Sequence, residues 1–458
     1  MHRLFLAAAA AAALLGADLR DARAQQTPLS RPPLPTFPDI NPPGPPVRPP
    51  PALRRVPPRE EAPPTRPVPP PPAESAGLAR DLEAALEIDA LARAIRGQRE
   101  AVLARNALVR SPIAGSPAIG SSFRSDTRGP RIGNEWDVEV AAPLWLPGQR
   151  GALAGTVTTG VEEQERRFAL RRLELAGLLR DAWWAANLAE SALQVARDRL
   201  ATARDIGRDV QRRVELGDIP ETEALLTRNE ELAAVLEVSR AEAAVAAART
   251  AYRTLTGGSD AALQASGAAT LVRAQPASLN GAMHPAIRAA EAALATAQAR
   301  ARLVAATPID NPELGLFTRG QGGPVTENGT SLGLRVRIPL PTEARNAPRR
   351  ADAEAERTRA EGELLQTRRV VEGEIALAQQ GLAAAEQARR LAAERRAVAE
   401  RQITAARTAF RAGEIGAFDL FRVRQLQIEA AAVDARAQVD VGRARSRLNQ
   451  ALGLLPGG

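Results

Sequence analysis

The fold is decided by two stretches, VELGDIPETEALL at residues 214–226 and FRAGEIGAFDLFR at residues 410–422. Each interrupts a long helical pattern with a glycine, which can adopt φ > 0 and end a helix. An acid, an isoleucine and a second acid follow in both: Gly217, Asp218, Ile219 and Glu223 in the first, and Gly413, Glu414, Ile415 and Asp419 in the second. The acids suit the positive N-terminus of the next helix. Each stretch is therefore predicted to form the tip of a helical hairpin.

Other landmarks repeat with the same spacing of 196 residues, which is the distance from Gly217 to Gly413. The repeated pairs are Ala142-Pro143-Leu144 with Ile338-Pro339-Leu340, Leu255-Thr256-Gly257 with Ala451-Leu452-Gly453, and Trp136 and Val138 with Leu332 and Leu334. Leu108-Val109 meets Leu303-Val304 at a spacing of 195, so one residue has been gained or lost between these blocks. The chain is thus an internal duplication, with one copy at residues 78–258 and the other at 259–458.

Each copy has one very long helical pattern with an apolar seam that alternates steps of four and three, as in a coiled coil. In the first copy, expected from Gly148 to about Leu216, the seam is Leu175, Leu179, Ala182, Ala186, Ala189, Leu193, Ala196, Leu200, Ala203, Gly207, Val210 and Val214. In the second copy it is Val371, Ile375, Ala378, Leu382, Ala385, Ala392, Ala399, Ile403, Ala406 and Phe410, with Arg389 and Arg396 as exceptions. A helix of roughly 70 residues is about 100 Å long, which no compact domain needs.

Shorter helices complete each copy. The helices that return from the tips, expected at 220–256 and 416–452, are about half as long as the long ones. Short helices are expected at 78–109, with a break at Gly97, and at 285–304. Because these pairs together match the length of the long helices, we expect long antiparallel layers.

A strand pattern lies between the short and the long helix of each copy. A short strand is expected near 119–123, and the residues from Trp136 to Leu144 alternate strictly between two faces. In the second copy Leu332, Leu334, Val336, Ile338 and Leu340 are interleaved with Gly333, Arg335 and Arg337. In a soluble protein such a segment would be an ordinary half-buried strand. Here each hairpin has nothing obvious to pack on, and a length of about ten residues suits a tilted membrane strand.

The N-terminal residues are predicted to leave the cytoplasm. Arg3, an apolar run at residues 4–16 and the small-x-small site Ala22-Arg23-Ala24 describe a signal peptide at residues 1–24. Of the 45 residues at 28–72, 21 are proline, so the segment 25–77 is expected to be disordered and extended. It is interpreted as a spacer, with contact to peptidoglycan or a partner as the alternative.

Composition excludes several classes of function. The formal net charge is +8, but acids and arginines alternate along the helices, so nucleic-acid binding is not expected. There is no cysteine, which excludes disulfides, thiolate metal sites and a lipid on cysteine. The two histidines, His2 and His284, form no ligand cluster, and no phosphate-binding glycine loop is visible. We therefore expect no catalytic site, no cofactor and no metal site.

The ordered set of elements, present twice, resembles the TolC family of outer-membrane efflux channels. The resemblance covers residues 78–454 and includes both tips, Met283-His284-Pro285 before a helix, and Asn311-Pro312-Glu313-Leu314 before a strand. It implies a mainly α fold with a small β part, in which duplicated helical hairpins form an α-barrel. It also implies that four strands from each protomer of a homotrimer form one shared transmembrane β-barrel.

The resemblance further implies a function and partners. The chain would be the outer-membrane channel of a tripartite efflux or type I secretion system, with its helices in the periplasm and its strands in outer-membrane lipid. Substrates would come from an inner-membrane pump through a periplasmic adaptor that docks on the tip residues Gly217, Asp218, Ile219, Gly413, Glu414 and Ile415. The channel would be passive and do no chemistry.

The resemblance also implies a periplasmic gate. In the family, acidic residues just past the second tip form rings that narrow the mouth, and Asp419 matches the first ring. The second ring falls on Arg422, and an arginine latch of the family falls on Ile415. The gate is therefore expected to rest on Asp419 together with Glu223, whereas the alternative for both acids is a helix-terminal role.

Two other classes of protein fit part of the pattern. A periplasmic adaptor also has a signal peptide and a long hairpin, but it would need one hairpin between β-rich halves, and this chain has two hairpins. A soluble coiled-coil scaffold would not need the alternating strands. The substrate, whether metal ion, drug or other, is not readable from the sequence.

Overall fold

The computed structural model describes residues 73–127, 133–264, 284–323 and 326–456. The chain divides into two units, Met1–Val68 and Pro69–Gly458, and the second contains every described residue. The predicted signal peptide and nearly all of the proline-rich segment lie outside the described residues. The first helix begins at Ala73, five residues before the predicted start of the first copy.

The elements repeat in the predicted order. In the first copy they are α1 (Ala73–Ile88), α2 (Ala90–Ala104), α3 (Asn106–Arg110), β1 (Ala118–Ser125), β2 (Asn134–Pro143), α4 (Gln149–Glu215), α5 (Glu221–Thr256) and α6 (Ala261–Gln264). In the second copy they are α7 (Pro285–Ala305), β3 (Glu313–Gly323), β4 (Thr326–Arg337), α8 (Glu343–Arg411) and α9 (Ala417–Ala451). The long helices have 67 and 69 residues and the returning helices 36 and 35, so the predicted proportions are confirmed.

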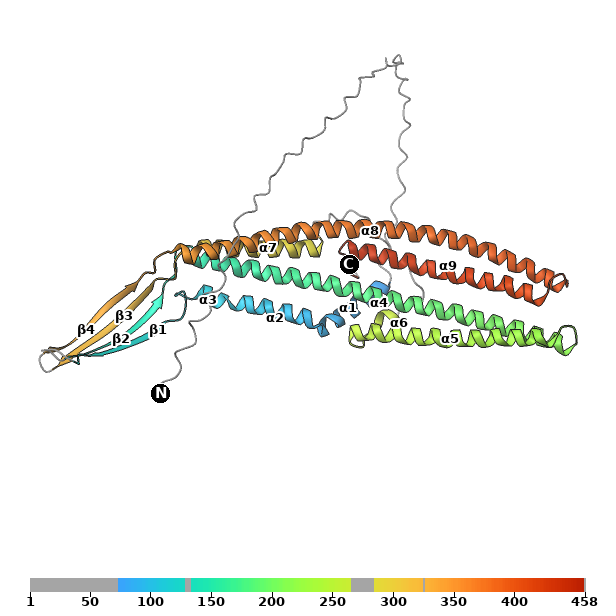
Figure 1. Cartoon of the computed structure of the whole chain (residues 1–458), viewed down its shortest axis with the longest axis horizontal. Coiled ribbons are helices and arrows are strands. Elements are labelled where there is room, and N and C mark those ends of the chain that lie inside the picture. The colour runs from blue at the N-terminus through green and yellow to red at the C-terminus, as the bar shows by residue number, and fades with distance from the viewer. Residues whose placement is uncertain (1–72, 128–132, 265–283, 324–325, 457–458) are drawn as a thin grey trace, which may run out of the picture. The chain divides into compact units, whose positions relative to one another are not determined.

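The helices of the second unit lie side by side, with the sheet at one end and the tips at the other (Figure 1). Helix α4 contacts α2 and α5 on one side and α7 and α9 on the other, and α7 and α9 in turn contact α8. The short helices continue the line of the returning helices, as predicted. Helices α8 and α5 therefore lie at opposite edges of this layer.

The predicted seams form the contacts between these helices. Every seam residue of α4 and α8 is buried or half-buried, from Leu175 to Val214 and from Val371 to Phe410. The two exceptions, Arg389 and Arg396, are exposed. Arg396 reaches α9, where its Nη1 lies 3.0 Å from a carboxylate oxygen of the buried Asp434. The coiled-coil interpretation of both long helices is thus confirmed.

The prediction of one short helix broken at Gly97 was wrong. Gly97 lies inside α2, and the breaks fall at Asp89, between α1 and α2, and at Arg105, between α2 and α3. The Asp89 carboxylate accepts a hydrogen bond from the backbone N of Ala92 at 2.7 Å and so caps α2. Arg171 of α4 holds the same carboxylate with two hydrogen bonds, of 2.9 and 3.0 Å. The helix is therefore interrupted at Asp89, which caps α2 and is bound by Arg171, although the apolar spacing alone predicted a continuous helix there.

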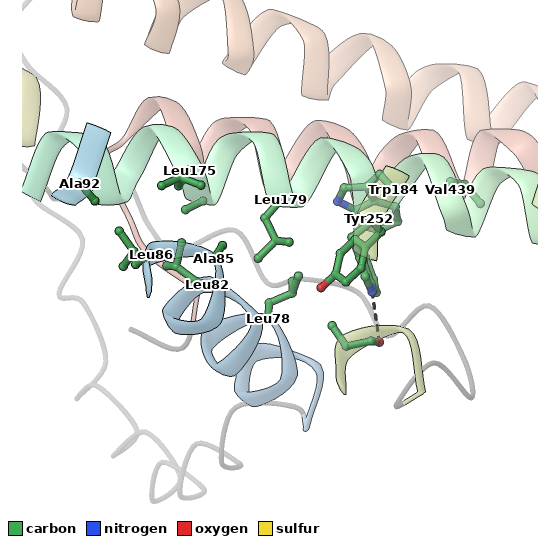
Figure 2. Close-up of a cluster of buried hydrophobic side chains, with 13 residues drawn as sticks. Leu78, Leu82, Ala85, Leu86, Ala92, Leu175, Leu179, Trp184, Tyr252 and Val439 are labelled. Atoms are coloured by element: carbon green, nitrogen blue, oxygen red, sulfur yellow. Dashed lines mark hydrogen bonds between the residues drawn. The ribbon is translucent and has the colours of Figure 1, made fainter. Parts of the chain in front are cut away.

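The main core lies where α1 and α6 cover α4 and the end of α5 (Figure 2). Its buried residues are Leu78, Leu82, Ala85, Leu86, Ala92, Leu175, Ala176, Leu179, Trp183, Trp184, Tyr252, Ala262 and Val439. Trp183 and Trp184 pack edge to face at 4.6 Å. Below them the fully buried Asp81 accepts hydrogen bonds from the Tyr252 hydroxyl at 2.6 Å, the Ser259 hydroxyl at 2.5 Å and the backbone N of Ala261 and Ala262. The short helix α6, which the sequence did not predict, completes this polar knot.

The four strands form one antiparallel sheet in the order β1-β2-β3-β4. The two repeats meet at the β2–β3 pair, where Trp136 lies opposite Gly320 and Val140 opposite Leu316. Strand β4 ends at Arg337, so Ile338 and Leu340, which the sequence predicted to continue the strand, lie beyond its end. Among the described residues, β1 and β4 pair on one side only and leave two open edges.

Candidate functional site: helical tips and a two-faced sheet

The two tips have the same backbone geometry. Gly217 and Gly413 both have φ of 78°, the left-handed region that glycine adopts without strain. The residue after each glycine donates its backbone N–H to a carbonyl five residues earlier, from Asp218 to Arg213 and from Glu414 to Ala409, both at 2.9 Å. This pattern is a Schellman C-cap, and it explains why the glycine recurs in both copies.

The predicted docking residues are largely accessible. Both glycines and the acids Asp218 and Glu414 are exposed, whereas Ile219 and Ile415 are half-buried. The two hairpins meet just inside the tips, where the Arg213 guanidinium lies over the Phe410 ring at 4.2 Å. Further along, Arg424 of α9 donates to the Thr202 hydroxyl of α4 at 2.7 Å. Burial lowers the pKa of Arg424.

The two predicted gate acids lie in different surroundings. Both are in the first turn of a helix, Glu223 in α5 and Asp419 in α9. Asp419 is exposed, and no described residue forms an ion pair with it. Glu223 is half-buried, and its Oε2 atom is shielded from water without a hydrogen-bond partner in the described part of the chain. No described hydrogen bond or ion pair brings the two acids together within one chain.

A cleft opens between the two hairpins beside Glu223. Its volume is about 340 Å³, and its lining residues are Arg199, Glu223, Leu226, Thr227, Glu230, Phe418, Phe421, Arg422 and Gln425. We refer to it as the tip cleft. The sequence did not single out Phe421 or Arg199, because their convergence depends on how the hairpins pack.

The sheet has one apolar face that is open to the surroundings. Cross-strand partners place on this face Ile119, Phe123, Trp136, Val138, Val140, Leu314, Leu316, Leu332, Leu334 and Val336. All of them are exposed, Leu332 by 73% and Ile119 by 78%. So large an exposed apolar surface marks contact with a lipid or a protein partner. The predicted alternation of β2 and β4 is thus confirmed, and β3 extends it.

The opposite face is polar and its charges are paired. Arg319 lies 2.7 Å from Asp137 and 2.9 Å from Glu135. Arg335 pairs with Glu139, and Arg337 pairs with Glu313 at 3.0 Å. The sequence pattern predicts the polar positions of β2 and β4 but not Arg319, because glycines and Thr318 obscure the apolar alternation along β3 beyond Leu316.

Two aromatic rings cover glycines of the sheet. The Trp136 ring lies where a Cβ of Gly320 would be, and the Phe317 ring lies where a Cβ of Gly333 would be. The guanidinium carbon of Arg335 lies over the Phe317 ring, 4.9 Å from the centre of the ring. An aromatic side chain over a cross-strand glycine restores the contact that glycine lacks and fixes the register of the pair.

None of the helices among the described residues is both long enough and apolar enough to cross a bilayer. In the same residues no group of three or more histidine, aspartate or glutamate side chains is placed to hold a metal ion. His284 instead caps α7, because its Nδ1 accepts a hydrogen bond from the backbone N of Ala286 at 3.2 Å. Burial lowers the pKa of His284.

The chain is similar in structure to several solved outer-membrane proteins. The outer membrane protein VceC of Vibrio cholerae is 15% identical, with 82% of this chain and 96% of that chain covered at a TM-score of 0.65. A structure of CusC, described in terms of transmembrane channel formation, is 16% identical over 83% and 92% of the two chains at 0.67. The Campylobacter jejuni outer membrane channel CmeC is 14% identical over 84% and 88% at 0.64.

Neither family models nor curated protein sequences match the chain. The solved structures, at these identities, establish a common fold, and more than four fifths of the chain aligns with each of them. The resemblance to the TolC family is therefore confirmed as a likeness of fold: this chain has the fold of an outer-membrane channel protomer, with two tandem helical hairpins and a four-stranded antiparallel sheet.

Proposed function

We propose that the protein is the outer-membrane channel of an efflux or type I secretion system, and that it forms a homotrimer. The observation that carries the proposal is the two-faced sheet at one end of very long helical hairpins. One face is apolar and exposed, the other carries paired charges, and neither edge has a partner strand among the described residues. In lipid every backbone group needs a hydrogen-bond partner, so the sheets of other subunits are expected to pair with these edges.

The exposed faces of the helices at the two edges of the layer also suit contacts between subunits. The exposed residues of α8 include an apolar one at every seventh position: Val370, Leu377, Ala384, Leu391, Val398 and Ala405. Helix α5 at the other edge has its own exposed apolar residues: Leu225, Leu232, Val235 and Leu236. Because α4 packs on α9 within the chain, the duplication predicts that α8 of one subunit packs on α5 of the next.

The duplication gives a register for this contact. Within the chain, Trp184 of α4 lies against Gly442 of α9. A shift of 196 residues gives Gln380 of α8 and Ala246 of α5, both exposed in one chain. Because the chain has no cysteine, the double variant Gln380→Cys with Ala246→Cys has only two thiols. A short bismaleimide should then produce covalent trimers in outer-membrane fractions.

The controls for this experiment are the two single variants. Each should remain a monomer on a denaturing gel after treatment with the bismaleimide. A second double variant, Arg359→Cys with Ala246→Cys, places the two thiols about 30 Å apart along the helix axis, because Arg359 lies 21 residues from Gln380. It should give no covalent trimers. Recovery of the wild-type protein as a soluble monomer would overturn the membrane assignment, and the proposal with it.

The tips are proposed to dock a periplasmic adaptor that connects the channel to an inner-membrane pump. The supporting observations are that Gly217 and Gly413 adopt the same left-handed turn and that Asp218 and Glu414 are exposed beside them. Replacing both glycines by valine strains only the turns. Efflux should then be lost in a susceptibility assay while the covalent trimer still forms. Unchanged efflux would mean that the tips are not docking surfaces.

The gate is proposed to rest on Asp419, with Glu223 in a smaller role. Three copies of an exposed acid near one axis would repel one another, unless a cation bridges them, and would favour cation passage. Asp419→Asn should raise single-channel conductance or weaken block by multivalent cations, and Glu223→Gln should change both less. If conductance, ion selectivity and cation block are all those of the wild type, Asp419 serves only the helix end.

We further propose that the channel is passive and carries out no reaction. The periplasmic adaptor considered from the sequence needs a single hairpin, and this chain has two of nearly equal length. A soluble coiled-coil scaffold has no use for a sheet with a fully exposed apolar face. These two alternatives therefore have no observation in their favour.

A further inference from the structure

The tip cleft contains one acid, Glu223, and one base, Arg422, that form no ion pair with any residue that the structure describes. Glu223 Oε2 is shielded from water and accepts no hydrogen bond from a described residue. Arg422 lines the same cleft, is exposed and forms no ion pair with the described residues. The two are not within ion-pair distance of each other. A buried carboxylate oxygen without a donor is unfavourable, so an occupant that donates to it is stabilised.

The other charges of the cleft are already neutralised. Arg199 of α4 binds Glu230 at 2.6 Å and Glu237 at 2.7 Å, and these carboxylates raise its pKa. A singly charged ligand would be attracted by Glu223 or Arg422 and repelled by the other. A ligand that carries both signs would be attracted by both residues.

The remaining walls are apolar. Phe418 and Leu226 are exposed by 70% and 61%, and Phe421 is half-buried beside them. Aromatic rings attract the apolar body of a ligand and, through their faces, a cationic group. A volume of about 340 Å³ lies within the range of small-molecule sites.

We propose that the tip cleft binds a small zwitterionic amphiphile. Its cationic group donates to Glu223, and its anionic group meets Arg422. Its apolar part lies on Phe418 and Phe421. The site belongs to one chain and does not depend on the channel function, because all of its lining residues come from α4, α5 and α9 of the same chain.

The test compares three benzyl or phenyl probes by calorimetry on the purified full-length protein: N-benzyltaurine, a zwitterion whose ammonium keeps two N–H donors, benzylammonium and benzenesulfonate. The zwitterion should bind about tenfold more tightly than either singly charged probe, which is the usual effect of one added hydrogen bond between charged groups. Glu223→Gln and Arg422→Gln should each remove that preference. Phe418→Ala should weaken all three probes.

The matched control is Glu221→Gln, since Glu221 is in the same helical turn as Glu223 but is not part of the cleft. It should leave all three affinities unchanged. The proposal is overturned if the zwitterion binds no more tightly than benzylammonium, if Glu223→Gln does not alter its affinity, or if no probe binds to the wild type. The last result would also mean that Glu223 and Arg422 satisfy each other in solution.

Discussion

The two repeats place different chemistry at corresponding positions of the same architecture. At one such position the first repeat has Leu200 and Val238, both half-buried, on its long and returning helices. A shift of 196 residues gives Arg396 and Asp434, which form an ion pair at 3.0 Å. Two apolar positions in one repeat thus correspond to an ion pair in the other. The neighbouring seam positions, Ala196, Ala203, Ala392 and Ala399, are small in both repeats, so we expect the pair to be exchangeable.

A second difference concerns how the repeats fasten their short helices. The first repeat caps α2 with Asp89, which Arg171 grips from α4, and locks α1 through Asp81. At the position of Asp89, 195 residues on, the second repeat has His284, and a shift of 196 from Arg171 gives Thr367. The first repeat is therefore fastened by charge, and the second by a neutral imidazole. Four predictions test these two differences between the repeats.

The largest effect is expected for Asp81→Ala. The variant leaves two hydroxyls and two backbone N–H groups of the knot without an acceptor, at about 4 kcal/mol in total. Hydrogen exchange at the Ala261 and Ala262 amides should report local opening of α1 and α6, while α7 is unaffected. The matched control is Glu83→Ala on the same helix, because Glu83 forms an exposed pair with Arg172 that is worth less than about 1 kcal/mol. Equal effects of both variants would contradict the special role of Asp81.

The second prediction exchanges the ion pair for the pair of the first repeat. Arg396→Leu alone leaves the buried Asp434 without its cation and should cost about 2 kcal/mol, a value reduced because Arg396 is partly exposed. Addition of Asp434→Val should restore stability to within about 0.5 kcal/mol of the wild type, because apolar residues can replace a buried pair. Hydrogen exchange along α9 measures both. A double variant as unstable as the single one would show that the repeats are not interchangeable here.

The third prediction concerns Asp89→Ala. Loss of the cap and of the two hydrogen bonds from Arg171 should cost about 2 kcal/mol and fray the start of α2. Because Arg171 hydrogen bonds hold the pKa of Asp89 below its usual range, its contribution is present at neutral pH and is lost only as pH falls below the ordinary value near 3.8. Exchange at the Ala92 amide reports the loss. Asp89→Asn should retain the cap and cost less, and equal losses would exclude the capping role.

The smallest effect is a pH response confined to the second repeat. Burial lowers the pKa of His284, so between its ordinary value near 6.5 and the folded value the unfolded chain binds a proton that the folded chain does not. Stability therefore falls as pH falls through this range, and protonation of Nδ1 removes the acceptor that caps α7. Between pH 7.5 and 5, opening at the Ala286 amide should increase about fivefold, or about 1 kcal/mol, after correction for intrinsic exchange. The Ala92 amide is the internal control, and a response of equal size there would remove the asymmetry.

The sequence predicted the elements that depend on local or repeated patterns. The heptad seam from Leu175 to Val214, the turns at Gly217 and Gly413 and the alternation of β2 follow from spacing and from the one residue that tolerates a positive φ. Each of these patterns occurs in both repeats, so the prediction for one repeat is supported by the same pattern in the other.

The parts that escaped prediction depend on residues far apart in the chain. Asp81 meets Tyr252, Ser259 and Ala262 across at least 171 positions, so no local pattern announces the knot. The break at Asp89 was placed at Gly97, because the helical spacing continues through Asp89 and only Arg171 reveals its role. The tip cleft likewise exists only once the two hairpins pack. The proposed roles of Asp419 and Glu223 stay predictions.

The open edges of β1 and β4 have a consequence for how such a protein is made. A single chain in lipid would have unpaired backbone groups at both edges, and in water it would expose the apolar face, so neither solvent suits the monomer. In the proposed channel, insertion and subunit assembly are then one concerted step that needs a chaperone until all edges meet. A subunit with a proline in β1 would stall every ring that it joins, because one broken edge leaves the barrel open. Coexpression of such a subunit with the wild type should be genetically dominant, with the loss of efflux larger than its share of the chains.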